Sequence, residues 1–68
     1  MPEVTYLVRC EKLNGNVEIW EHVWEDLAKE HFASFDDTDA DIYKTVQLFK
    51  RDYNKNEDDV LLEEKVFD

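Results

Sequence analysis

The chain has 68 residues, of which 43% are hydrophobic and 13% aromatic, and its formal net charge is -10 at pH 7. This length allows one domain, residues 1–68, and the apolar content is too high for a disordered chain. The excess of Asp and Glu disfavours direct binding to nucleic acid or to an anionic membrane.

Cys10 is the only cysteine, which excludes an internal disulfide and favours a reducing, cytoplasmic location. The N-terminal segment lacks the layout of a signal peptide, and no apolar run has the length of a membrane span. Since Cys10 alternates with other apolar residues, we expect it to be a small core residue and not a nucleophile.

The first part of the chain predicts a β-hairpin. Residues 4–12 alternate between two faces, with Val8 and Cys10 on the inner one, as in a half-buried strand. Asn14-Gly15 is a strong hairpin signal, so residues 17–22 should pair back as a second strand. In this second strand we expect Val17 and Ile19 on the core face, and Glu18, Trp20 and His22 on the other face.

Residues 24–35 predict one amphipathic helix. Their apolar side chains recur at helical spacing and form one broad stripe, made of Val23, Leu27, His31 and Phe35 beside Trp24, Ala28 and Phe32. Glu25 and Asp26 lie in the first turn, where a carboxylate can cap the helix. A helix this short is marginal alone in water, so it must dock on a sheet.

The second part of the chain predicts another hairpin. Residues 36–41 read as an acidic turn, residues 42–53 as a long strand, and residues 60–67 as the last strand. The inner faces of these two strands should carry Ile42, Val46, Leu48, Val60, Leu62 and Val66.

The fold class that follows is α+β with the order ββαββ. We expect a four-stranded antiparallel sheet of order 2-1-3-4 with the helix packed on one face, because both hairpins then stay local and no connection crosses another. A mixed sheet of order 2-1-4-3 is the main alternative.

One helix covers only one face of such a sheet, so the other face is predicted to lie open. Leu7, Arg9, Trp20, His22, Tyr43, Phe49, Arg51, Tyr53 and Leu61 are expected on it. Monomers rarely leave such a patch bare, and Trp, Tyr and Arg often anchor interfaces. The predicted partner-binding residues are therefore Leu7, Trp20, Tyr43, Phe49, Arg51 and Tyr53. Aromatic pairs across strands could equally stabilise this face without a partner.

Motifs for chemistry are weak. Asp37, Asp39 and Asp41 have the spacing that opens an EF-hand loop, but Ile42 replaces its glycine and Leu48 its final glutamate. His22 and His31 show no zinc-binding spacing, and His31 is expected to be a partly buried packing residue. No glycine-rich phosphate loop exists, and the domain is too small for a large pocket. We expect no cofactor, no metal and no enzyme activity.

Three functions remain open. The first is a non-catalytic interaction module that binds a partner protein or forms a homodimer through the open aromatic face. The second is an acidic inhibitor of the phage type that mimics nucleic acid and blocks a basic groove, through the predicted acidic surface of Asp36, Asp37, Asp39, Asp41, Glu63 and Glu64. Further acidic residues, Glu57, Asp58, Asp59 and Asp68, surround the last strand. The third is an orphan structural domain, since charge runs are usually solvated surface.

Overall fold

The computed structural model describes residues 3–55 and 58–67, and it confirms the ββαββ order. Strands β1 (Val4–Lys12), β2 (Val17–His22), β3 (Tyr43–Asp52) and β4 (Val60–Val66) form one sheet of order β2-β1-β3-β4. Every neighbouring pair is antiparallel, so the mixed order 2-1-4-3 is excluded.

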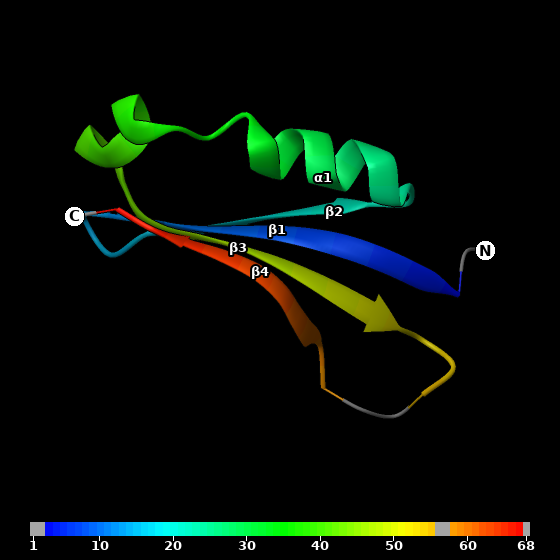
Figure 1. Ribbon diagram of the computed structural model, residues 1–68. Helices are drawn as coiled ribbons and strands as arrows, with labels where there is room; N and C mark the ends of the chain where they lie inside the picture. Colours follow the sequence, from blue (N-terminus) through cyan, green and yellow to red (C-terminus); the bar gives the residue numbers. More distant parts are fainter. Residues whose placement is uncertain (1–2, 56–57, 68) are drawn as a thin grey trace.

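Helix α1 (Glu25–Ala33) and the 3-10 helix η1 (Asp37–Asp41) connect β2 to β3. Figure 1 shows α1 lying along one face of the sheet, where it packs on β1 and on its neighbours β2 and β3, while the β3–β4 hairpin extends beyond it. Among the described residues no helix covers the opposite face, which is called the open face below.

The core lies between α1 and the two central strands. Its buried side chains are Val8, Cys10, Ala28, Phe32, Val46 and Leu48, and Tyr6, Phe35, Tyr43 and Phe67 pack around it. Burying a large aliphatic or aromatic side chain is worth about 1.5–3 kcal/mol, so these few residues supply most of the driving force for folding. The expectation that Cys10 belongs to this core is confirmed.

Helix α1 is capped differently from the expectation. Neither Glu25 nor Asp26 is the N-cap; that position belongs to Trp24, whose side chain makes no capping hydrogen bond. At the other end, Lys65 of β4 donates from Nζ to the carbonyl oxygens of Phe32 and Phe35, at 2.9 and 2.7 Å. The Phe32 carbonyl also accepts from the Phe35 amide at 3.3 Å, and Phe35 lies two residues beyond α1. A lysine from another element thus stabilises the backbone at the helix C-terminus.

The apolar stripe of α1 is only partly buried. Ala28 and Phe32 enter the core, but Leu27 of the neighbouring row remains 50% exposed. The C-terminal part of the stripe therefore docks through Phe32 and Phe35, while Trp24 and Leu27 at its start stay exposed.

The β1–β2 hairpin has a register that reverses the predicted faces of β2. A two-residue Asn-Gly loop would pair Leu13 with Asn16 and place Ile19 opposite Cys10. Instead the loop spans residues 13–15, because Gly15 has φ +92° and the amide of Lys12 donates to the carbonyl of Asn16. Glu18 now lies opposite Cys10, so the register is shifted by one residue.

This shift turns every side chain of β2 to the other face. Trp20 lies opposite Val8 and His22 opposite Tyr6, both on the helix side. The prediction that Trp20 and His22 face away from α1 is therefore wrong. So is the prediction that Val17 and Ile19 join the core, since both are exposed.

Two β-bulges change the remaining faces. In the first, Glu11 and Lys12 of β1 pair with Thr45 and Tyr43 of β3, so that Lys44 between them is unpaired. Tyr43 therefore turns to the helix side, where it packs edge-on against Phe35. The prediction that Tyr43 lies on the open face is wrong for this reason. The other leaves Leu62 of β4 unpaired.

Beyond the second bulge the parity of β4 is reversed. Lys65 and not Val66 lies on the helix side, and Val66 is opposite Thr45 on the open face. The prediction that Val66 points inward is therefore wrong. The same reversal brings the Lys65 ammonium to the end of α1.

Candidate interaction surface

The open face consists of rows of side chains that run across the four strands. The row at the middle of the sheet contains Glu21, Leu7, Phe49 and Leu61, in the order β2-β1-β3-β4. Leu7 is almost fully buried here although no helix covers it, and Phe49 is half-buried. Neighbouring long side chains therefore already shield the centre of this face from water.

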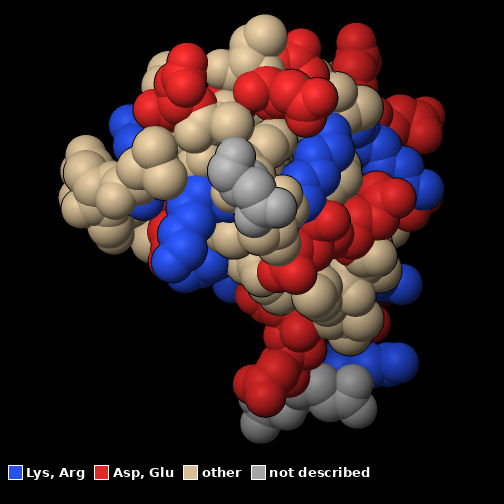
Figure 2. Space-filling view, turned by 60° about the vertical axis from the view of Figure 1, so that its left-hand side comes forward, with Lys and Arg blue, Asp and Glu red and all other residues tan. Residues whose placement is uncertain are grey.

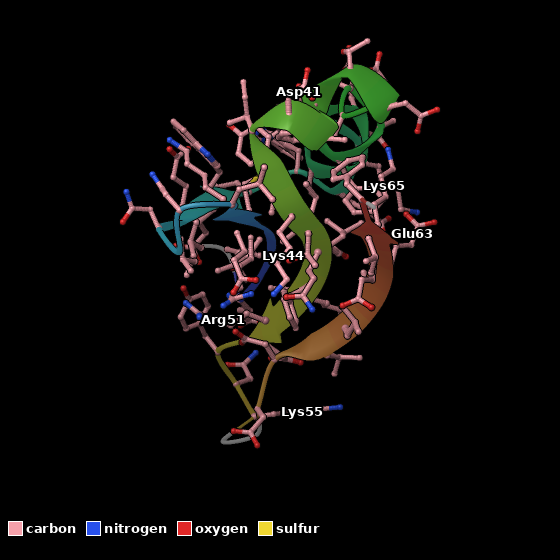
Figure 3. All side chains as sticks on the ribbon, turned by 90° about the vertical axis from the view of Figure 1, so that its left-hand side faces the viewer. Asp41, Lys44, Arg51, Lys55, Glu63 and Lys65 are labelled. Atoms are coloured by element: carbon pink, nitrogen blue, oxygen red, sulfur yellow. The ribbon has the colours of Figure 1, made fainter. Side chains whose placement is uncertain are left out.

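Polar side chains on the open face bind one another. Arg9 donates to Gln47 at 3.0 Å, and Gln47 donates to Glu64 at 2.6 Å, which joins three strands. Arg51 donates through Nε and Nη2 to both carboxylate oxygens of Asp59, each at 2.9 Å. Arg51 lies opposite Thr5 on this face, and Figure 3 labels it near the lower end of β3.

Glu21 makes a second polar centre. Its Oε2 accepts hydrogen bonds from the hydroxyls of Thr5 and Tyr53. These two donors hold the pKa of the Glu21 carboxyl below its usual value, because they stabilise the charged form. The open face is consequently more polar and more self-contained than the sequence indicates.

The six predicted partner-binding residues do not form one surface. Leu7, Phe49, Arg51 and Tyr53 lie on the open face. Trp20 and Tyr43 lie on the helix side, where Trp20 contacts His31 and Tyr43 contacts Phe35. Among the four that remain together, only Tyr53 is strongly exposed, at 55%.

A different apolar surface surrounds β2. It is called the β2 surface here, and its side chains are between 42% and 67% exposed: Val17, Ile19, Trp20, Val23, Trp24 and Leu27. Val17 and Ile19 lie on the open side of β2, and Trp20 lies on the helix side. The other residues follow in the connection to α1 and in its first turns. Of this group only Trp20 is predicted from the sequence to bind a partner, on the face opposite to Val17 and Ile19.

The backbone of β2 is also unpaired on one side, because β2 is an outer strand of the sheet. Its two carboxylates are already engaged, Glu18 by Lys12 at 2.6 Å and Glu21 by Thr5 and Tyr53. The other outer strand, β4, has a bulge and carries Glu63, Glu64 and Lys65. Bulges and charges protect an edge against pairing, so β2 is the less protected edge.

The predicted acidic residues lie in two separate places, the segment of η1 and strand β4. Asp36 and Asp39 form a capping box that begins η1, in which Asp36 accepts from the Thr38 amide at 2.9 Å and Asp39 accepts from the Asp36 amide at 2.9 Å. The Thr38 donors lower the pKa of Asp36. Asp37 and Asp41 are left exposed on the same short helix.

The acidic residues of β4 point in two directions. Glu63 lies opposite Leu48 on the helix side, and Glu64 lies opposite Gln47 on the open face. Figure 2 shows acidic side chains at the top and along the right of one view, with Lys and Arg side chains between them. Glu57 and Asp68, also expected to be acidic surface, lie outside the described residues.

The described part of the chain contains no group of three or more His, Cys, Asp or Glu side chains placed to hold a metal ion. Burial raises the pKa of the Cys10 thiol to about 11, which keeps it protonated and unreactive at neutral pH. His31 is partly buried, as expected, but it also bonds His22, which the sequence did not indicate. Neither described helix is long and apolar enough to cross a membrane.

The arrangement defines a small α+β protein with one helix-covered and one open sheet face. No protein-family model, no curated protein and no solved structure matches this chain.

Proposed function

We propose that this protein is a small interaction module without catalysis of its own, and that the β2 surface binds a partner protein or a second copy of the chain. The supporting observation is the concentration of exposed apolar side chains on both sides of the less protected edge strand. A partner that adds a strand to β2 would bind its free backbone groups and cover Ile19 on one side and Trp20 on the other.

Among the side chains of the β2 surface, the two tryptophans are expected to contribute most of the binding free energy. Trp20 is 51% exposed and Trp24 is 67% exposed. Tryptophan is enriched among the few residues that dominate binding energy, and truncating such a residue typically costs about 2 kcal/mol or more of binding free energy. Trp24 also occupies an N-cap position that Ser, Thr, Asp or Asn would fill better. Its presence there costs helix stability, which is consistent with selection for contact.

The charge of the chain restricts the partner. At -10, the chain repels nucleic acid and anionic membranes, so the proposal includes neither. A partner with a basic surface would associate faster, particularly at low salt. We place the protein in the cytoplasm, because its single cysteine is free and buried.

The test compares three double variants. Ile19→Ser with Trp20→Ser alters the β2 surface, and Tyr53→Ser with Leu61→Ser alters the open face. A matched control, Leu13→Ser with Ile42→Ser, removes equally exposed apolar side chains that lie beside the β1–β2 turn and are not part of the β2 surface. All substituted residues are between 46% and 59% exposed, so each variant should fold.

Sedimentation velocity over a concentration series measures self-association, and immobilised chain measures capture of proteins from the native host. The expected result is an association shown by the wild type, the control and the open-face variant, and lost by the β2 variant. Loss in the open-face variant alone would move the contact to the open face. Equal behaviour of all four chains, or no association at all, would refute the proposal. Binding abolished by high salt but by none of the variants would instead favour the acidic mimic.

A further inference from the structure

One polar contact joins α1 to the edge strand. His22 Nε2 of β2 and His31 Nδ1 of α1 are 2.9 Å apart, and both rings are partly buried. Their ring centroids are 5.1 Å apart, which is the nitrogen–nitrogen distance plus about one ring radius at each end. The two nitrogens therefore point almost directly at each other, as in a hydrogen bond.

This geometry does not suit a shared metal ion. In a metal site the lone pairs of both imidazoles converge on a third point, and further ligands complete the coordination. Here each lone pair is directed at the other ring, and Trp20 and Phe35 flank His31 with ring centroids 6.0 and 5.5 Å away. The pair is a hydrogen bond in an aromatic environment.

Such a bond depends on the number of protons. When both imidazoles are neutral, one donates its N–H to the other. When one is protonated, it still donates to its neutral partner. When both are protonated, the two facing nitrogens each carry a hydrogen, so no acceptor remains and two positive charges meet.

We propose that His22 and His31 form a proton-operated latch between β2 and α1. The latch is closed while the pair is neutral or carries one additional proton, and binding of a second additional proton opens it. Opening would release the β2 side of α1. The other side would stay attached, because Phe32 remains in the core and Lys65 holds the helix C-terminus.

No carboxylate in the described contacts offsets the second charge. On β2, Glu18 is paired with Lys12, and Glu21 lies on the opposite face. On β1, Tyr6 lies opposite His22, and on β3 the cation Lys50 lies opposite Tyr6 in the same row. On α1, Glu30 is next to His31 in sequence but is exposed, and on β4 the positive Lys65 lies at the end of the helix. The second proton on the histidine pair is therefore disfavoured by burial and by charge repulsion, and the described carboxylates offset little of this cost.

The pH range follows from the direction of the shift. Burial, and then the charge of His22, lower the pKa of His31 below its ordinary value of 6.5. The unfolded chain then binds this proton at higher pH than the folded chain does. The stability that the closed latch contributes is complete above pH 6.5 and is lost as the pH falls below that value toward the lowered pKa.

The experiment follows both imidazoles by NMR and measures native-state amide exchange of α1, from about pH 8 to about pH 5, where histidine changes charge. Two variants keep the bond but cannot be protonated. In His22→Gln the amide replaces Nε2, and in His31→Asn the amide replaces Nδ1. Glu18→Gln is the matched control, because it removes a titrating group from the same face of β2 and leaves both histidines.

The expected result is two separate titration steps for the pair. During the second step, protection of α1 amides falls relative to β1 and β3 amides, by about tenfold for each unit by which the pKa is lowered. Glu18→Gln should keep this loss, and both amide variants should lack it. The proposal is overturned if the two rings titrate in one step at the ordinary value. It is equally overturned if the sheet loses protection together with α1, or if the amide variants lose protection as the wild type does.

Discussion

At the scale of single residues, Lys65 links elements that the sheet alone would leave separate. Its ammonium donates to two carbonyls at the end of α1 and lies 4.7 Å from the centre of the Phe32 ring. Figure 3 shows Lys65 at the upper end of β4, beside the helix and above Glu63. A cation at a helix C-terminus also interacts favourably with the helix dipole.

Lys65→Met should lower the free energy of unfolding by about 1–3 kcal/mol, because the side-chain stem is retained while two hydrogen bonds from a charged donor are lost. Urea denaturation followed by circular dichroism measures this. Lys29→Met is the control: Lys29 pairs with Glu25 at 3.5 Å, both are about half exposed, and the change should stay within about 0.5 kcal/mol. Equal losses in the two variants would show that the contact of Lys65 with α1 contributes nothing specific.

At the scale of elements, the β1–β2 hairpin depends on one backbone conformation. Gly15 has φ +92°, and a Cβ added there would meet no atom within 4 Å. The cost of a side chain at this position is therefore conformational and not steric.

Gly15→Ala should destabilise the chain by about 1–2 kcal/mol, the usual penalty for a left-handed backbone with a Cβ. Gly15→Asn should lose less, since Asn tolerates positive φ better. Thermal denaturation of both variants beside the wild type measures the difference. If Ala and Asn were equally well tolerated, the three-residue loop could not be what fixes the register.

The elements themselves could be predicted from the sequence, but their faces could not. β1 and β2 have the expected bounds, and α1, β3 and β4 differ from the expectation by only one or two residues at their ends. Alternation and helical spacing depend on local side chains, so they survive small errors. Which way Trp20, Tyr43 and Val66 point depends on one loop length and two bulges, and each of these is a single-residue shift.

The candidate site shows the same limit at larger scale. Exposed aromatic residues and an acidic surface could be expected from composition, but their grouping could not. The β2 surface combines residues from both sides of a strand and from the helix, and a one-residue error in β2 separates Trp20 from Ile19. The His22–His31 bond could not be predicted for the same reason, since it requires His22 on the helix side.

At the scale of the whole molecule, the main feature that affects stability is the negative net charge. The net charge of -10 belongs to a chain of 68 residues, and the ion pairs among the described residues are few and partly exposed. Self-repulsion of this kind destabilises the compact state and is screened by salt.

Raising NaCl from about 0.01 M to about 1 M should therefore raise the melting temperature at pH 7, as the Debye length falls from about 30 to about 3 Å. Each 1 kcal/mol of repulsion removed corresponds to about 4–8 °C in a domain of this size. The matched control is the same titration near the sequence pI of 4.4, where the net charge is small and the salt effect should largely disappear. A melting temperature that fell with salt at pH 7 would mean that attractive pairs outweigh repulsion.

The three-residue loop around Gly15 has one more implication. Because side chains alternate along a strand, deleting a single residue from that loop would exchange the inward and outward sets of β2 without altering its composition. Ile19 would then meet the helix, and Trp20 would move to the underside of the sheet. Two chains that differ by one loop residue could thus display different side chains on each face of the same fold. A single insertion or deletion at this turn is therefore enough to change which partner β2 recognises.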